Sequence, residues 1–222
     1  MPVEVYMGSK FDTPYEREAL SVIVTDLDVL FRNTSDLCIV LANYFIQGYQ
    51  VDITILTRDS IIIVELKDCS LPFTATENGI WKCPNGHIVG QKDNNPFQQV
   101  YNYRIKWKEF LGDKKSEFNC LSAITDNRAL WQMRGVVAIS PKLHREVKFD
   151  TPNRNKIWWF DLIGSNKVGE YVSFQTNKYL NFSDAELRLI PTLLNIPGQV
   201  QDPIQDPIQD LLQNLLQDQS FT

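Results

Sequence analysis

The sequence predicts an α/β domain, because segments with helical periodicity alternate with short, strongly apolar segments that favour strands. Three observations support this prediction. Residues 15–31 carry apolar side chains at helical spacing, residues 37–67 hold three apolar runs separated by turn residues, and residues 61–64 are apolar on both faces. A strand of this last kind is typical of the centre of a sheet that is covered on two sides.

The composition is that of one sizeable globular domain, with 222 residues, 43% of them hydrophobic and 22% charged. The net charge of −5 argues against a protein that coats nucleic acid by bulk charge, but it does not exclude a local basic groove. No apolar run reaches the roughly 18 residues of a membrane span, and the N-terminus lacks the pattern of a signal peptide. We therefore expect a cytoplasmic protein with no membrane partner.

The cysteines at positions 38, 69, 83 and 120 show no disulfide-like spacing, and free thiols fit that compartment. Cys69, Cys83 and His87 lack the paired ligands at short spacing that structural zinc sites show, so no zinc is expected.

The first half of the chain predicts a helix, a meander and a hairpin. Residues 15–31, YEREALSVIVTDLDVLF, form an amphipathic helix. Residues 37–46, 49–56 and 60–67 are β-branched and aromatic with brief turns between them, which predicts an antiparallel meander. Residues 73–89 contain two Asn-Gly turn signals, which indicate a projecting hairpin.

The second half predicts further helices and strands. Asn95 and Pro96 fit the cap and first turn of a helix that runs to about Leu111, and a weaker helix covers 119–130. Buried strands are expected at 133–140 and 156–162. A capping box at 183–186 opens a last short helix, which Pro191 should end or kink.

From Gln199 onward the composition changes to the repeat QDPIQDPIQDLLQNLLQDQ, so we expect a domain over 1–198 and a low-complexity tail or linker over 199–222. Its prolines forbid a regular helix across the first half, whereas the leucines of the second half fit a narrow apolar stripe. A disordered tail and a short oligomerisation or docking helix both agree with this pattern.

Three charged residues lie inside the apolar strands: Asp52, Glu65 and Lys67. Glu65 and Lys67 share a face because residues two apart on a strand do so, and pairing of 49–56 with 60–67 brings Asp52 alongside Glu65. Two carboxylates in a low dielectric repel, and a divalent cation relieves the repulsion. Magnesium prefers oxygen ligands and often takes only one or two carboxylates. Lys67 would then orient or deprotonate a water, or stabilise a phosphate oxygen.

The helix at 15–31 adds a fourth candidate. At about 100° per residue, Glu16 falls on the buried stripe and Glu18 on the opposite side. An inward carboxylate near a helix start either caps backbone N–H groups or meets a cation.

The helix that begins at Pro96 places Gln99 and Tyr103 on one face, where an amide and a phenol can hold a water or a phosphate oxygen. Arg104, Lys106, Trp107 and Lys108 follow, and together with Tyr103 they are candidates for nucleic-acid contacts. A solvated helix face explains the basic residues equally well.

These motifs resemble the P-D-(D/E)-x-K nuclease superfamily, and more closely its nuclease-related (NERD) domain. The matching segments are 15–20 (YEREAL), 51–52 (VD), 63–67 (IVELK), 95–99 (NPFQQ, the family's Asn-Pro-x-x-Gln) and Gln99-x-x-x-Tyr103. The chain departs from the family at Tyr15, where Gly is frequent, and at Ile53, where His or another polar residue is common.

The resemblance implies a restriction-endonuclease-like core with a central mixed sheet flanked by helices. It also implies a Mg²⁺-dependent nuclease (Mn²⁺ may substitute) that hydrolyses phosphodiester bonds, with DNA as the substrate. Its catalytic residues would be Glu16, Asp52, Glu65, Lys67 and Gln99, and its metal ligands Glu16, Asp52 and Glu65. The alternative is a non-catalytic nucleic-acid-binding or docking module. A helicase or another DNA-processing partner, and an oligomer formed through the tail, are further expectations.

Overall fold

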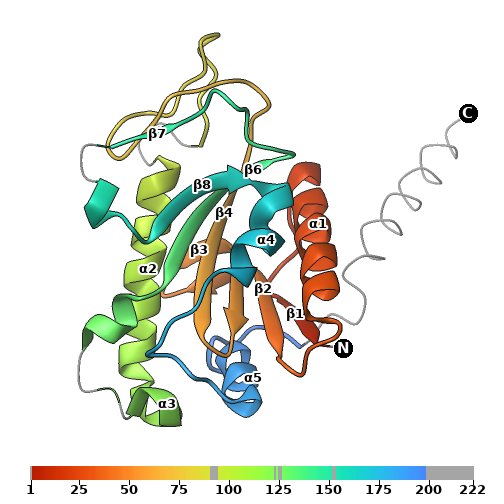
Figure 1. Ribbon diagram of the computed structural model, residues 1–222, viewed down its shortest axis with the longest axis vertical. Helices are drawn as coiled ribbons and strands as arrows, with labels where there is room; N and C mark the ends of the chain where they lie inside the picture. Colours follow the sequence, from red (N-terminus) through yellow and green to blue (C-terminus); the bar gives the residue numbers. More distant parts are fainter. Residues whose placement is uncertain (1, 91–94, 123, 125–126, 152–153, 199–222) are drawn as a thin grey trace, which may run out of the picture.

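The computed structural model describes residues 2–90, 95–122, 124, 127–151 and 154–198. A six-stranded sheet in the order β1-β2-β3-β4-β6-β8 forms its centre, with helices α1 and α2 on opposite sides (Figure 1). Its strands are β1 (Val3–Met7), β2 (Cys38–Ile46), β3 (Tyr49–Thr57), β4 (Ser60–Asp68), β6 (Arg134–Ser140) and β8 (Phe160–Gly164). The helices are α1 (Pro14–Phe31), α2 (Pro96–Asp113), α3 (Asn119–Ser122), α4 (Val168–Ser173) and α5 (Asp184–Leu193).

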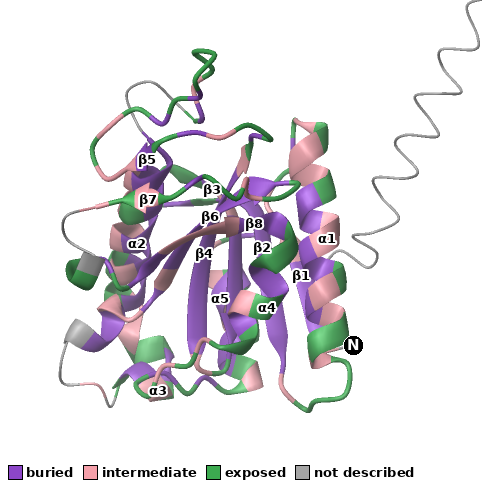
Figure 2. Ribbon diagram, turned by 45° about the horizontal axis from the view of Figure 1, so that its top comes forward, coloured by how far each residue is buried: buried purple, intermediate pink, exposed green. Residues whose placement is uncertain are grey.

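The sheet is mixed, which confirms the predicted fold class. Strands β2, β3 and β4 form the expected antiparallel meander. At one edge β1 runs parallel to β2, and at the other edge β6 runs parallel to β4 and β8 runs parallel to β6. The sequence analysis did not predict β1, a five-residue strand at the edge of the sheet. The central strands are buried on both faces, as the apolar run at 61–64 predicted (Figure 2).

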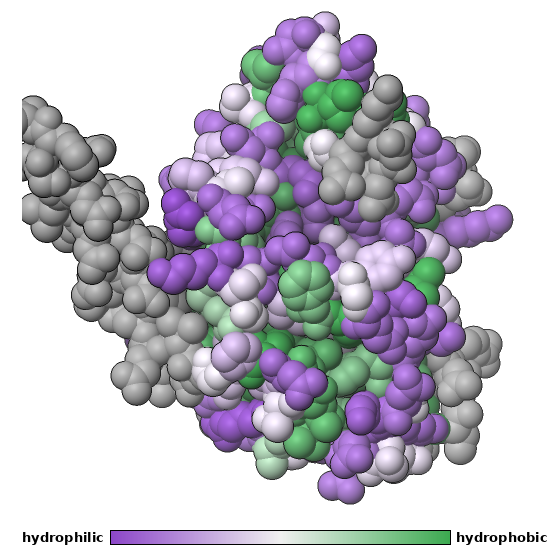
Figure 3. Space-filling view, turned by 180° about the vertical axis from the view of Figure 1, so that it is seen from behind, coloured by the Kyte–Doolittle hydropathy of each residue, from purple (hydrophilic) through white to green (hydrophobic). Residues whose placement is uncertain are grey.

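Each face of the sheet has its own hydrophobic core. The α1-side core joins α1 and α4 to the even-numbered residues 38, 40 and 42 of β2. The α2-side core joins α2 and α5 to Ile39 and Leu41 of the same strand. Around the outside, hydrophilic side chains dominate the back of the molecule, and hydrophobic ones gather in its lower half (Figure 3). Among the described helices, none has the length and apolar character needed to cross a membrane.

Helix ends follow the predicted signals. Asn95 caps α2 by accepting a hydrogen bond from the Gln98 N–H at 2.9 Å, and Pro96 is the first residue of the helix. A capping box between Ser183 and Glu186 opens α5, which ends at Leu193, shortly after Pro191.

Two predicted elements differ in extent. Of the helix expected over 119–130, the described residues form α3 and a 3₁₀ turn, Asn127–Trp131. The strand expected over 156–162 begins at Phe160, because the residues before it turn and place Ile157 and Trp159 in a third apolar cluster. The hairpin expected over 73–89 projects as drawn at the top of Figure 1. It contains isolated bridges and the short strand β5 (Ala75–Thr76), which pairs with β7 (Phe149–Asp150). The tail at 199–222 lies outside the described residues.

Candidate active site

The sheet forks at the charged residues. Strands β3 and β4 pair from Thr57 and Ser60 up to Ile53 and Val64, and the next residues along are Asp52 and Glu65. Beyond this point β3 continues to pair with β2, and β4 continues to pair with β6. Asp52 accepts a hydrogen bond from the backbone N–H of Leu66 across the fork, with 2.7 Å between Oδ2 and N. The fork thus leaves room for side chains where backbone pairing would otherwise fill the sheet.

A cavity of about 280 Å³ lies at this fork. The structure brings together there the side chains of Glu16, Asp52, Glu65, Lys67, Gln99 and Tyr103, all of them selected from the sequence. Strand β3 supplies Asp52, strand β4 supplies Glu65 and Lys67, and helix α2 supplies the amide and the phenol.

The charges in this cavity are strongly coupled. Glu65 is only 2% exposed, and the Lys67 ammonium donates a hydrogen bond to its Oε1. Burial, and then the negative charge of Glu65, raise the pKa of Asp52 well above its ordinary value. Burial lowers the pKa of Lys67, but the two carboxylates outweigh burial and the pKa is raised overall. Burial also raises the pKa of Tyr103, and the charges of Glu65 and Asp52 add to that increase.

Two buried oxygen atoms of the cavity accept no hydrogen bond of ordinary geometry from the residues that the structure describes, although the Tyr103 hydroxyl lies close enough to Glu65 for that carboxylate to raise its pKa. They are Oε2 of Glu65 and Oε1 of Gln99. Buried acceptors are normally paired, so their lone pairs indicate a site for a donor or a cation. Among the described residues, no three His, Cys, Asp or Glu side chains gather as a metal site. The central oxygen donors are the carboxylates of Asp52 and Glu65 and the amide of Gln99, with the Glu16 carboxylate at the wall, and such a set fits Mg²⁺ with several waters retained.

Glu16 lines the cavity and also caps its own helix. Its Oε2 accepts hydrogen bonds from the hydroxyl and the backbone N–H of Thr13, at 2.6 and 3.3 Å. Its Oε1 accepts a long hydrogen bond from the Tyr15 hydroxyl at 3.4 Å. Both readings of this inward carboxylate thus have a structural counterpart, whereas Glu18 is exposed as expected.

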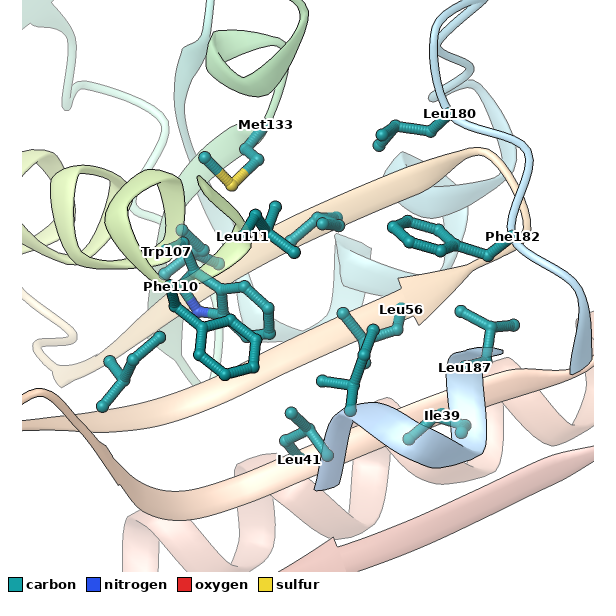
Figure 4. Close-up of a cluster of buried hydrophobic side chains, with 14 of the residues drawn as sticks. Ile39, Leu41, Leu56, Trp107, Phe110, Leu111, Met133, Leu180, Phe182 and Leu187 are labelled. Atoms are coloured by element: carbon teal, nitrogen blue, oxygen red, sulfur yellow. The ribbon is translucent and has the colours of Figure 1, made fainter. Parts of the chain in front are cut away.

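Three of the residues predicted to contact nucleic acid are buried, and while Tyr103 lines the cavity, Arg104 and Trp107 are interior residues. Arg104 is 3% exposed, donates hydrogen bonds to the carbonyls of Met133 and Trp131, and stacks 4.0 Å from the ring centroid of Trp159. Trp107 is fully buried and packs in the α2-side core (Figure 4). A polynucleotide cannot reach Arg104 or Trp107 without local unfolding. The prediction that these two residues contact nucleic acid is therefore wrong, and both stabilise the fold instead.

The remaining basic candidates, Lys106 and Lys108, flank the buried Trp107 on α2. Lys106 pairs with Glu109 at 2.8 Å and lies over the ring of Tyr49, and Lys108 lies over the ring of Trp131. Both side chains are partly exposed and stay candidates for phosphate contacts.

The sequence analysis missed the other residues that line the cavity: Phe11, Asp12, Thr13, Asn43 and Gln50. Gln50 stands two residues before Asp52 on β3 and lines the cavity although the facing of the strand changes between Val51 and Ile53. Placing Asn43 in the cavity requires the register between β2 and β3, which cannot be read from the sequence.

The family model for the nuclease-related domain, NERD, matches residues 23–140, more than half of the chain. This span contains Asp52, Glu65, Lys67, Gln99 and Tyr103, and begins after Glu16. The search of curated proteins and the search of solved structures returned no match. By the extent of the family match and by the acid pair at the fork of its sheet, the chain belongs to the nuclease-related domain family.

Proposed function

We propose that the protein is a metal-dependent nuclease that hydrolyses phosphodiester bonds, with DNA as its substrate. One observation carries the proposal: the partly buried Asp52 and the buried Glu65 lie together at the fork, next to the Lys67 ammonium, with acceptor atoms left unpartnered among the described residues. A purely structural role would favour pairing every buried acceptor. A site that must receive a ligand leaves such atoms open.

Asp52 and Glu65 are the residues that would hold Mg²⁺, with the amide oxygen of Gln99 and the carboxylate of Glu16 as further donors. When bound, Mg²⁺ would supply charge neutralisation and Lewis-acid polarisation of the scissile phosphate.

The remaining polar groups of the cavity would act on the substrate. The Lys67 ammonium is placed beside Glu65 to stabilise a phosphate oxygen or to orient the attacking water. Gln99 and Tyr103 project from one face of α2 and would hold a water or a phosphate oxygen in position. Lys106 and Lys108 would attract the polynucleotide backbone to an otherwise acidic protein.

The test is a cleavage assay with purified protein. Linear and circular DNA, single- and double-stranded, and a matched RNA are incubated with Mg²⁺, Mn²⁺ or EDTA. We expect cleavage of DNA with either metal and none in EDTA. The Glu65→Gln variant should be inactive, and Glu18→Gln, which changes an exposed carboxylate on α1, should match wild type. Binding of DNA without cleavage under every metal condition would favour the non-catalytic module instead.

A further inference from the structure

Asn43 has a backbone conformation that is unusual for the middle of a strand. Its φ of 44° lies in the left-handed region, which Asn tolerates better than most residues with a side chain. It is 3% exposed and lines the acidic cavity. The pairs on either side of it place it opposite Asp52, which in turn lies opposite Glu65. Asn43, Asp52 and Glu65 thus form one row across three strands.

In both strands of the β2–β3 hairpin, the alternation of side chains between the two faces of the sheet is interrupted at this row. On β2, the α2-side core contains Ile39 and Leu41 before the row but Tyr44 and Ile46 after it. Strict alternation would have placed Tyr44 and Ile46 on the other face. On β3, the odd residues Ile53 and Ile55 belong to the α1-side core, whereas Val51 belongs to the α2-side core.

The reversal coincides with the positive φ of Asn43. Within the described strands β2 and β3, Asn43 is the residue with positive φ, and Gln47 and Gly48 adopt it only in the turn that joins them. A left-handed residue inside a strand changes which face the following side chains point to, as a β-bulge does. The backbone of Asn43 therefore sets the direction in which β3 presents Asp52.

The side chain of Asn43 joins the wall of the cavity to this row. Its Nδ2 donates to the Lys10 carbonyl at 2.7 Å, and its Oδ1 accepts from Nε2 of Gln50 at 2.5 Å. Its own carbonyl accepts from the Ser9 N–H at 3.0 Å. The loop at 8–13 approaches so closely that a Cβ on Gly8 would lie 2.6 Å from the carbonyl oxygen of Asn43. Residues 11–13 of this loop line the cavity.

We propose that Asn43 is a positioning residue of the acidic site: its left-handed backbone aims the Asp52 carboxylate, and its amide ties the 8–13 loop and Gln50 around the cavity. The catalytic part of this inference rests on the proposed nuclease function. The positioning part concerns the metal-free chain and can be tested alone.

The experiment compares Asn43→Ala, Asn43→Gly and Asn195→Ala. Alanine disfavours the left-handed conformation and glycine accepts it. Asn195 is the matched control, because it has a φ of 55° but lies exposed after α5, away from the cavity. Three quantities are measured on folded protein: the hydrogen-exchange rate of the Leu66 amide in EDTA, the affinity for Mg²⁺, and DNA cleavage. The Leu66 amide reports directly on Asp52, which accepts its hydrogen bond.

We expect Asn43→Ala to speed exchange of the Leu66 amide about tenfold, and to weaken Mg²⁺ binding and cleavage by about tenfold or more. Asn43→Gly should restore the Leu66 exchange rate to within about twofold of wild type and raise cleavage above that of Asn43→Ala. Asn195→Ala should lose stability only.

Wild-type exchange, Mg²⁺ affinity and cleavage in Asn43→Ala would overturn the proposal. If Asn43→Ala does not fold, Asn43→Gly decides, and an unprotected Leu66 amide in that variant overturns the proposal too. If the wild-type protein neither binds Mg²⁺ nor cleaves DNA, the proposed nuclease function is wrong. The exchange rate of the Leu66 amide would still test whether Asn43 positions Asp52.

Discussion

The carboxylate of Asp52 accepts a hydrogen bond from the backbone N–H of Leu66 on the neighbouring strand, at 2.7 Å. A side chain thus does the work of a backbone carbonyl at the point where β3 and β4 separate. The same carboxylate lies beside Glu65 at the fork, so its negative charge is destabilising. Its acceptor oxygen, in contrast, is needed for the hydrogen bond from the Leu66 N–H. Substitutions that separate charge from hydrogen bonding are therefore the most informative.

Asp52→Asn should abolish activity without unfolding the protein. The amide oxygen can still accept from the Leu66 N–H, but one of the two repelling carboxylates is neutralised. We expect cleavage to fall at least about a hundredfold. The melting temperature in EDTA should be equal to or above that of wild type. Glu18→Gln, which changes an exposed carboxylate on α1, is the control. Wild-type cleavage would remove Asp52 from the site, and a much lower melting temperature in EDTA would point to a structural ion pair with Lys67.

The stability of the metal-free protein should depend on pH through Asp52. Burial and the charge of Glu65 raise its pKa in the folded state above the ordinary value of 3.8. The folded protein therefore binds this proton more tightly than the unfolded chain, and the stabilisation is complete below the ordinary pKa and lost as pH rises through the folded-state pKa. In urea unfolding in EDTA, the free energy of unfolding of wild type minus that of Asp52→Asn should fall as pH rises from about 4 through the raised pKa of Asp52. A constant difference would contradict the raised pKa.

Lys67→Met should lower the stability of the metal-free protein, the opposite of the effect expected for Asp52→Asn. It leaves Asp52 and Glu65 buried without their cationic neighbour, so the free energy of unfolding in EDTA should fall by about 3 kcal/mol. Lys106→Met breaks an exposed ion pair on α2 and should leave the free energy of unfolding unchanged. Adding Glu65→Gln to Lys67→Met should recover part of the loss. A Lys67→Met protein as stable as wild type would show that the ammonium does not balance the acid pair.

Arg104→Ala should reduce stability and not DNA affinity. The guanidinium holds the carbonyls of Met133 and Trp131 and packs on Trp159, so its loss should cost about 3 kcal/mol in urea unfolding. The affinity of the remaining folded protein for DNA, measured by fluorescence anisotropy, should equal that of wild type. Normal stability with weakened DNA binding would restore Arg104 as a surface contact.

Glu16 and Glu18 separate capping from metal binding. Glu16→Gln should weaken Mg²⁺ affinity by about tenfold, as measured by calorimetry, in addition to a capping loss of about 1 kcal/mol. Glu18→Gln, on the exposed side of the same helix, should change neither quantity. A Glu16→Gln protein that loses stability but keeps its Mg²⁺ affinity and turnover would make Glu16 a cap only.

Local patterns predicted the meander, α1, α2 and the grouping of Asp52, Glu65 and Lys67, because turns, caps and period-two alternation act over a few residues. They could not predict that β2 turns over at Asn43, which depends on pairing with β3 and on contacts with residues 8–10. Arg104 shows a second limit. Its charge suggested exposure to solvent, but the carbonyls of Trp131 in a 3₁₀ turn and of Met133, the residue before β6, accept its hydrogen bonds in the interior.

The fork described above also divides the sheet mechanically. Strands β1, β2 and β3 form one ribbon and strands β4, β6 and β8 form another, and the two share only the seam between Thr57–Ser60 and Ile53–Val64. Helix α2 packs against strands of both ribbons and acts as a brace across them. A ligand held by Asp52 on one ribbon and by Glu65 on the other would clasp the open end of that seam. Loading the site should therefore stiffen the whole sheet against twisting, well beyond the residues that touch the ligand.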